Sequence, residues 1–227
     1  FISLGLPDGL LGTAWPVIQG EFAVPFGSAG FVSMTIAGGT IISSLLSARF
    51  LKRFGTGKVT VVSVLLTAIA LLGFSQAPGF IWLMVLAVPL GLGAGSVDAG
   101  LNDFVAKNYA ARHMSWLHCF WGIGAMSGPL VISQFISRGE SWRYGYLTIA
   151  IVQFVLIAVL FFALPVWDRV TKLSGRHIPE PEAAELPVEQ VQSAPAPKGI
   201  LGPLSIPGVK AAVLTFLFYC GVEATMG

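Results

Sequence analysis

The sequence predicts an all-α integral membrane protein: a six-helix bundle, then a polar linker, then the start of a seventh helix. The composition is the first reason, because 55% of the 227 residues are hydrophobic and 11% are charged. A soluble globular protein carries about 25% charged residues, so this chain lacks the polar surface to dissolve. The second reason is that apolar stretches recur at the length of about 20 residues that a membrane-spanning helix needs.

Seven such stretches follow one another along the chain. The first six cover residues 1–20, 28–50, 57–76, 80–105, 114–137 and 143–165, and the seventh runs from 207 to 227. Short polar or Gly/Pro breaks separate the first six. We therefore expect a transmembrane bundle over residues 1–165, a linker over 166–206 and the start of a second bundle over 207–227.

The linker differs in composition from the rest of the chain. It is rich in proline and glutamate, which is typical of a segment without a packed core. Six helices, a linker and a restart are also the pattern of a transporter made of two parallel halves. The residues concerned are Pro179, Pro181, Pro187, Pro195, Pro197, Pro203, Glu180, Glu182, Glu185 and Glu189.

Basic residues indicate the orientation in the membrane. If the chain starts inside the cell, 11 of the 13 lysines and arginines fall on the inner side. Short inner loops carry such an excess of positive charge in membrane proteins. The sequence therefore predicts a multi-pass protein of the cell (cytoplasmic, inner) membrane, with the N-terminus and the linker in the cytoplasm.

Acidic residues inside the apolar stretches are the first candidates for function. Asp8 lies in the first stretch, and Asp98 and Asn102 share one face of the fourth. A charge at the bilayer centre costs several kcal/mol on insertion scales, so such residues usually face a cavity and act there. We expect Asp8 or Asp98 to carry the proton; the alternative for Asp98 is an acid that groups of neighbouring helices satisfy. Glu223 matches Asp8 in the seventh stretch, because each acid is followed by a glycine four residues later.

His118 and Trp121 lie one turn apart in the fifth stretch. Together they could offer a hydrogen bond and a ring to one ligand. An equally good interpretation is a histidine that bonds a neighbouring helix.

The loop at 48–58 joins the second and third stretches and is predicted to form a cytoplasmic gate. Its basic side chains Arg49, Arg53 and Lys58 surround a tight turn at Gly55. Such side chains can bond helix C-terminal carbonyls and the acids of another helix. The alternative is that inner loops are simply basic.

Glycines in the apolar stretches are expected to serve packing. Gly91 and Gly95 form a stripe that lets two helices approach closely, and glycines 5, 9 and 12 would do the same in the first helix. No Gly-Lys-Ser follows a strand, so these are not nucleotide-binding glycines.

Other functional classes find little support. The histidines at 113, 118 and 177 lack metal-ligand spacing, and no nucleophile elbow is present. No basic and aromatic stripe suggests nucleic acid. Cys119 and Cys220 are interpreted as small hydrophobic residues without a disulfide. We therefore expect no enzyme, no metal and no cofactor.

The loop at 48–58 resembles a signature of the major facilitator superfamily of secondary transporters. The signature has the form Gly-x-x-x-Asp-Arg-x-Gly-x-x-Lys. Arg53, Gly55 and Lys58 match it, whereas Ala48 replaces the glycine and Lys52 replaces the acid. The resemblance implies an N-terminal half of a twelve-helix protein, monomeric, working by alternating access about a midplane site.

Within that superfamily the chain is most similar to the fucose permease group of sugar–proton symporters. That group has an acid in helix 1 and an acid in helix 4 that is followed by Asn and x-Phe. Asp8, Asp98, Asn102 and Phe104 match, with Asp in place of Glu in helix 4. The resemblance implies proton-driven uptake of a small polar solute, a sugar. The substrate-binding candidates are then Asp8, Trp15, Asn102, His118, Trp121 and Glu223.

Two alternatives stay open. A drug or metabolite exporter of the same superfamily has Gly-Pro followed by Gly-Gly in the fifth helix. Gly128 and Pro129 match the first pair, but Ile132 and Ser133 occupy the place of the glycines. A non-transporting membrane receptor is the second alternative, and it leaves the three intramembrane acids without a role.

Overall fold

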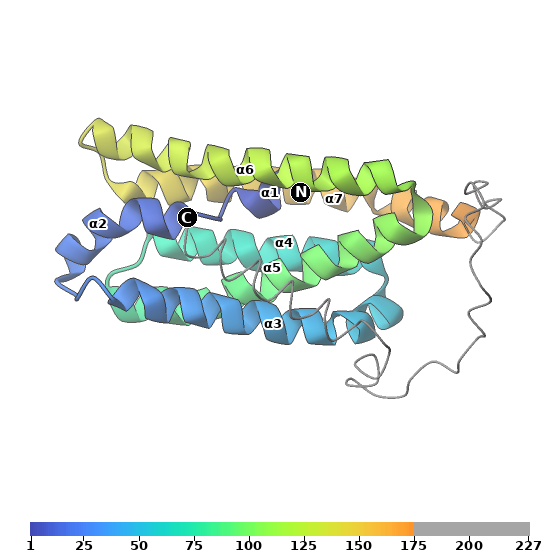
Figure 1. Ribbon diagram of the computed structural model, residues 1–227, viewed down its shortest axis with the longest axis horizontal. Helices are drawn as coiled ribbons and strands as arrows, with labels where there is room; N and C mark the ends of the chain where they lie inside the picture. The colour runs from blue at the N-terminus through green and yellow to red at the C-terminus, as the bar shows by residue number, and fades with distance from the viewer. Residues whose placement is uncertain (175–227) are drawn as a thin grey trace, which may run out of the picture. The chain divides into compact units, whose positions relative to one another are not determined.

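The computed structural model describes residues 1–174, apart from the side chains of Ala111 and of residues 168–174. The predicted seventh helix with Cys220 and Glu223, and the linker beyond residue 174, lie outside these residues. The described part is all-helical, and its long helices lie side by side lengthwise (Figure 1). The helices are α1 (Ile2–Gly5), α2 (Leu10–Phe22), α3 (Ser28–Phe54), α4 (Thr56–Ser75), α5 (Phe80–Asn108), α6 (Ala111–Ser137) and α7 (Trp142–Ser174).

Five of the described helices are long and apolar enough to cross a membrane, namely α3, α4, α5, α6 and α7. They fall on the second to sixth predicted stretches, so these predictions are confirmed. The last helix continues past the predicted end at residue 165 to Ser174. It therefore extends beyond the residue at which the linker is predicted to begin.

The prediction of one continuous helix over residues 1–20 is wrong. The chain forms the short α1, a break over residues 6–9, and then α2. Pro7 has no N–H, so it cannot donate to the carbonyl of Ser3 as a helical residue would. Gly9 follows in the left-handed region at φ +74°, which glycine adopts without steric cost. The two residues together end α1 and redirect the chain.

The predicted packing role of Gly91 and Gly95 is confirmed by the contact between α3 and α5. A methyl group at either glycine would overlap a backbone carbonyl oxygen of α3, that of Ile36 or of Thr40. Hydroxyl groups bond across the same contact, where Ser44 Oγ donates to the carbonyl of Gly95 at 3.2 Å. Small residues thus bring the two helices together, as in other membrane helix pairs.

The break region packs against α6 in a similar way. A methyl group at Gly5 would overlap the carbonyl oxygen of Trp121, and one at Gly9 would lie 3.0 Å from Cγ of Pro129. The prediction for Gly12 is wrong, because a methyl group there would meet no atom within 4 Å.

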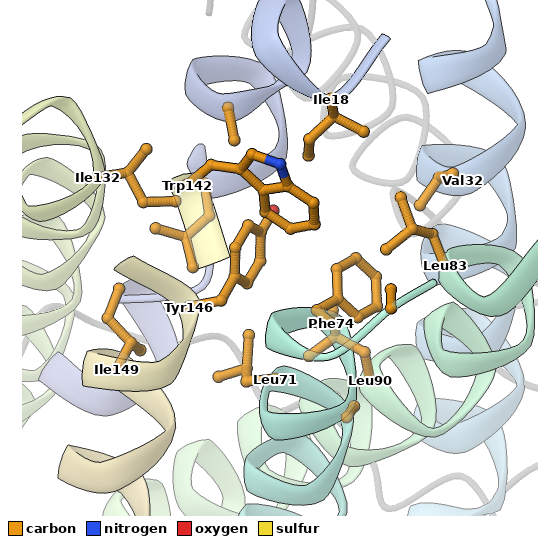
Figure 2. Packing of buried hydrophobic residues seen from close by; sticks show 14 of the residues in the cluster. Ile18, Val32, Leu71, Phe74, Leu83, Leu90, Ile132, Trp142, Tyr146 and Ile149 are labelled. Carbon is orange, nitrogen blue, oxygen red and sulfur yellow. The ribbon is translucent and has the colours of Figure 1, made fainter. Parts of the chain in front are cut away.

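A cluster of buried hydrophobic side chains lies near the loops that join α2 to α3, α4 to α5 and α6 to α7. Figure 2 shows Trp142 and Tyr146 of α7 beside Phe74 of α4. The rings of Phe74 and Tyr146 stack with centroids 5.4 Å apart, and Trp142 meets Tyr146 edge-on at 5.6 Å. Ile18 of α2 and Leu83 of α5 are fully buried in the same cluster. The cluster therefore fixes the end of the bundle toward which α2 runs.

Candidate functional site

Asp8 lies in the break between α1 and α2, on the exposed surface of the bundle. Its Oδ2 accepts a hydrogen bond of 2.9 Å from Nε1 of Trp121, which α6 supplies. The structure therefore brings together two predicted site residues that are 113 positions apart in the sequence.

Asp98 holds a corresponding position on α5. A glycine precedes each aspartate by three residues, Gly5 before Asp8 and Gly95 before Asp98. Each of these glycines lies against a backbone carbonyl of a neighbouring helix, that of Trp121 on α6 or that of Thr40 on α3. The sequence predicts Glu223 as the counterpart of Asp8, and Glu223 lies outside the described residues. The shared Gly-x-x-Asp spacing is the sequence signal that could have paired Asp8 with Asp98.

Asn102 and His118 complete the group around Asp98. Nδ2 of Asn102 donates to Oδ1 of Asp98 at 3.0 Å, one turn along α5. The Oδ1 atom of Asn102 is buried and has no hydrogen-bond partner among the described residues. His118 of α6 lies close enough to Asp98 for their charges to interact, and Asp98 interacts in the same way with Asp8.

His118 is exposed, and its ring meets the ring of Phe1 edge-on with centroids 6.2 Å apart. The histidine thus remains open to a ligand on its other side. We define the site cluster as Asp8, Asp98, Asn102, His118 and Trp121. It combines two carboxylates, an amide, an imidazole and an indole.

The structure does not bring Trp15 into the site cluster. Its side chain is 2% exposed and belongs to the apolar core beside Phe80, with ring centroids 6.4 Å apart. Its Nε1 donates to the carbonyl of Phe26 at 2.8 Å. The prediction that Trp15 binds the solute is therefore not supported, because both the ring and its N–H group are already used inside the bundle.

The predicted gate residues surround the turn from α3 to α4. Gly55 forms this turn at φ +79°, and the guanidinium of Arg53 lies 5.4 Å from the ring centre of Phe54. Arg49, Arg53 and Lys58 make no ion pair within the described part of the chain. A gate at this turn stays a prediction.

Sequence reasoning missed Gln153 of α7, which is 1% exposed. Its Nε2 donates to the carbonyl of Ser3 at 2.6 Å. This is the carbonyl that Pro7 leaves without its usual donor. The available signal was a glutamine inside an apolar stretch of membrane-spanning length, because a polar group buried there needs a hydrogen-bond partner.

Sequence reasoning also missed a group at the far end of α2. Oε1 of Glu21 pairs with Arg143 at 2.5 Å, and Oε2 accepts a hydrogen bond of 2.7 Å from Nε1 of Trp142. Arg143 also donates to the carbonyl of Ala77 at 2.8 Å. We call Glu21, Trp142, Arg143 and Ala77 the end clamp, because they join α2, α7 and the loop between α4 and α5.

Among the side chains that the structure describes, no group of three or more His, Cys, Asp or Glu is placed to hold a metal ion. Cys119 is a free, exposed thiol.

Comparison with known proteins agrees with this arrangement of helices. The family model of the Major Facilitator Superfamily matches residues 1–226, nearly the whole chain. The chain belongs to the Major Facilitator Superfamily. It is thus a multi-pass membrane protein of a family of transporters. The nearer resemblance to the fucose permease group stays a prediction.

Several curated members of the superfamily are similar to this chain. The synaptic vesicle 2-related protein of Bos taurus is 27% identical over 163 residues, which is 70% of this chain and 29% of that protein. The glucose/mannose transporter GlcP of Bacillus subtilis is 30% identical over 120 residues, 52% of this chain and 30% of that transporter. The cis,cis-muconate transport protein of Acinetobacter baylyi is 25% identical over 173 residues, 73% of this chain and 41% of that protein. The chain therefore spans well under half the length of these relatives.

Proposed function

We propose that this superfamily member serves the uptake of a small polar solute, a sugar, together with protons. The observation that carries the proposal is the pairing of Asp8 and Asp98. Asp8 lies in the break before α2 and Asp98 on α5, and each carboxylate has its own hydrogen-bond donor, Trp121 or Asn102. An arrangement of this kind lets one carboxylate respond to the charge on the other.

Proton coupling follows from the cost of enclosing charge. When the site closes around a solute, an unpaired carboxylate loses its water, which costs several kcal/mol. Protonation of Asp8 or Asp98 removes that charge and so favours closure. Opening on the other side rehydrates the group and releases the proton with the solute. The energy source is then the proton gradient, with no further cofactor.

The polar groups of the site cluster suit a sugar. A sugar hydroxyl both donates and accepts, so it can donate to the carboxylate of Asp8 or Asp98 and accept from the amide Nδ2 of Asn102. The indole of Trp121 offers an apolar face for the ring of a sugar, while its N–H is held by Asp8. Glu223, outside the described residues, is proposed to add a further acid from the second half.

The relatives suggest two solute classes, and the site favours one of them. One relative is named for glucose and mannose, and another for muconate. Muconate is a dicarboxylate, which Asp8 and Asp98 would repel when both are ionised. A neutral sugar suffers no such repulsion, so we place this chain with the sugar carriers.

The experiment measures solute accumulation in vesicles by the twelve-helix protein that the family resemblance implies. A set of sugars is tested under an imposed pH gradient. We expect Asp8→Asn or Asp98→Asn to lower accumulation at least about tenfold, because the variant side chain cannot exchange a proton. Exchange of solute without a gradient should persist in at least one variant.

The matched control is Asp103→Asn, which removes an exposed carboxylate from the same helix as Asp98. It should leave accumulation within about twofold of the wild type. Undiminished accumulation in both Asp8→Asn and Asp98→Asn would refute proton coupling. Net efflux would favour an exporter, and binding without flux would favour a receptor.

A further inference from the structure

A cavity of about 830 Å³ lies at the end of the bundle where α3 turns into α4. Four helices line it: α3 and α4 at their junction, and α5 and α7 near their C-terminal ends. Three of them contribute a lysine, namely Lys52, Lys58 and Lys107. None of the residues of the site cluster lines this cavity, so it is a separate feature.

The charges in this cavity are unbalanced. Among the lining residues whose side chains the structure describes, Asp103 is the acidic one, and it pairs with Lys107 at 2.7 Å. Lys52 and Lys58 are exposed and have no ion-pair partner in the described part of the chain. Lys52 also stands at the position where the superfamily signature has an acid. The cavity of this chain is thus cationic and suits an anion.

The backbone adds to the positive potential. Gly55 to Lys58 form the wall of the cavity at the start of α4, where no side chain caps the free N–H groups. The N-terminus of a helix favours negative charge. This contribution supports the lysines and is not needed to define the cavity.

The far wall of the cavity is apolar. Phe104 and Trp167 line it, and the same two residues line a second cavity of about 320 Å³. The lining of the second cavity is almost wholly hydrophobic, including Val97, Leu101 and Leu160. A ligand that reaches from the lysines to this wall needs an anionic head followed by an apolar segment.

We infer that the cavity lined by Lys52, Lys58 and Lys107, the lysine cavity, binds the phosphate of an anionic phospholipid from the surrounding bilayer. The cavity lies at the ends of helices of membrane-spanning length, the depth at which lipid headgroups lie. Basic pockets between membrane helices bind such headgroups, and lysine binds phosphate as a point charge. A soluble phosphate would use the lysines but leave the apolar wall unused. Lipid binding at this cavity does not depend on which solute the protein carries.

Native mass spectrometry, in detergent, of the twelve-helix protein that the family resemblance implies tests the inference. The probes are phosphatidylglycerol, phosphatidylcholine with the same acyl chains, and inorganic phosphate. We expect the chain to retain phosphatidylglycerol more tightly than phosphatidylcholine. The double variant Lys52→Gln/Lys58→Gln should weaken phosphatidylglycerol binding on the order of tenfold and leave phosphatidylcholine binding unchanged.

The matched control is Arg49→Gln/Arg112→Gln. It removes the same charge from two exposed arginines that do not line the cavity. It should change phosphatidylglycerol binding less than about threefold. Equal losses in the two double variants would refute a defined site, leaving general attraction to positive charge. Displacement of the lipid by an equal concentration of inorganic phosphate would refute a lipid occupant. Neither readout involves transport, so failure here is distinct from failure of the proposed function.

Discussion

At the scale of single residues, the break beside Asp8 depends on a side-chain hydrogen-bond donor that replaces a missing backbone donor. Pro7 removes the N–H that would serve the carbonyl of Ser3, and the side chain of Gln153 takes its place at 2.6 Å. In a membrane an unsatisfied backbone group costs several kcal/mol. Gln153 therefore stabilises the break and, through it, the position of Asp8.

We expect Gln153→Leu to lower the free energy of unfolding by about 1–3 kcal/mol, because it leaves the carbonyl of Ser3 without a donor. The measurement is unfolding of the chain in mixed micelles by increasing fractions of a denaturing detergent. Gln134→Leu is the matched control, since Gln134 is exposed on α6. A loss for Gln153→Leu no larger than for Gln134→Leu would contradict this role.

The two aspartates could be predicted from the sequence, whereas Gln153 could not be given its role. Asp8 and Asp98 are visible as charges within apolar stretches, and that alone marks them. The partner of Gln153 is a backbone atom 150 residues away, and no pattern in the sequence encodes that distance. Trp15 was predicted to bind the solute but lies in the core. The sequence alone does not distinguish a tryptophan that faces the core from one that faces a solute.

At the scale of helices, five of the seven predicted stretches are confirmed as continuous helices of membrane-spanning length, and the prediction failed at the first. Proline alone does not explain the failure, since Pro16, Pro89 and Pro129 lie inside continuous helices. The break at Pro7 differs because Gly9 follows in a left-handed conformation. A count of apolar residues cannot detect such a change in backbone conformation.

The contact between α3 and α5 gives the prediction at this scale. Gly95→Ala should lower the free energy of unfolding by about 1–3 kcal/mol, because the methyl group would overlap the carbonyl oxygen of Thr40 and force the helices apart. Gly38→Ala on α3 is the matched control, as a methyl group there would meet no atom within 4 Å. It should be neutral or stabilise the helix by about 0.5–1 kcal/mol. The same micelle unfolding experiment compares them, and equal effects would argue against close packing at Gly95.

At the scale of the whole bundle, two ends of different character enclose the site cluster. One end holds the lysine cavity at the turn from α3 to α4. The other holds the buried aromatic core and the end clamp, in which Arg143 joins α2, α7 and the loop at Ala77. Because α2 follows Asp8 directly, the clamp fixes the far end of the segment that carries the site.

The end clamp should make the stability of the bundle depend on pH. Burial acts to raise the pKa of Glu21, but hydrogen bonds from Trp142 and Arg143 and the charge of Arg143 outweigh it. The pKa of Glu21 thus lies below its ordinary value of 4.5. The contribution of the clamp is complete above pH 4.5, where Glu21 would be ionised even in the unfolded chain. It is lost as the pH falls through the lowered pKa.

Thermal unfolding of the chain in detergent between pH 7 and pH 3 measures this contribution. Glu21→Gln should lower stability at pH 7 by on the order of 1 kcal/mol or less, since the pair is partly exposed and screened by salt. The gap to the wild type should then close as the pH falls, because both proteins lack the charge in acid. The control is Glu140→Gln, which removes a carboxylate from the loop between α6 and α7. Glu140 makes no ion pair with any side chain that the structure describes, so this change should open no such gap at pH 7. A gap for Glu21→Gln that stays constant down to pH 3 would show that Glu21 acts through packing, and the end clamp would then not be electrostatic.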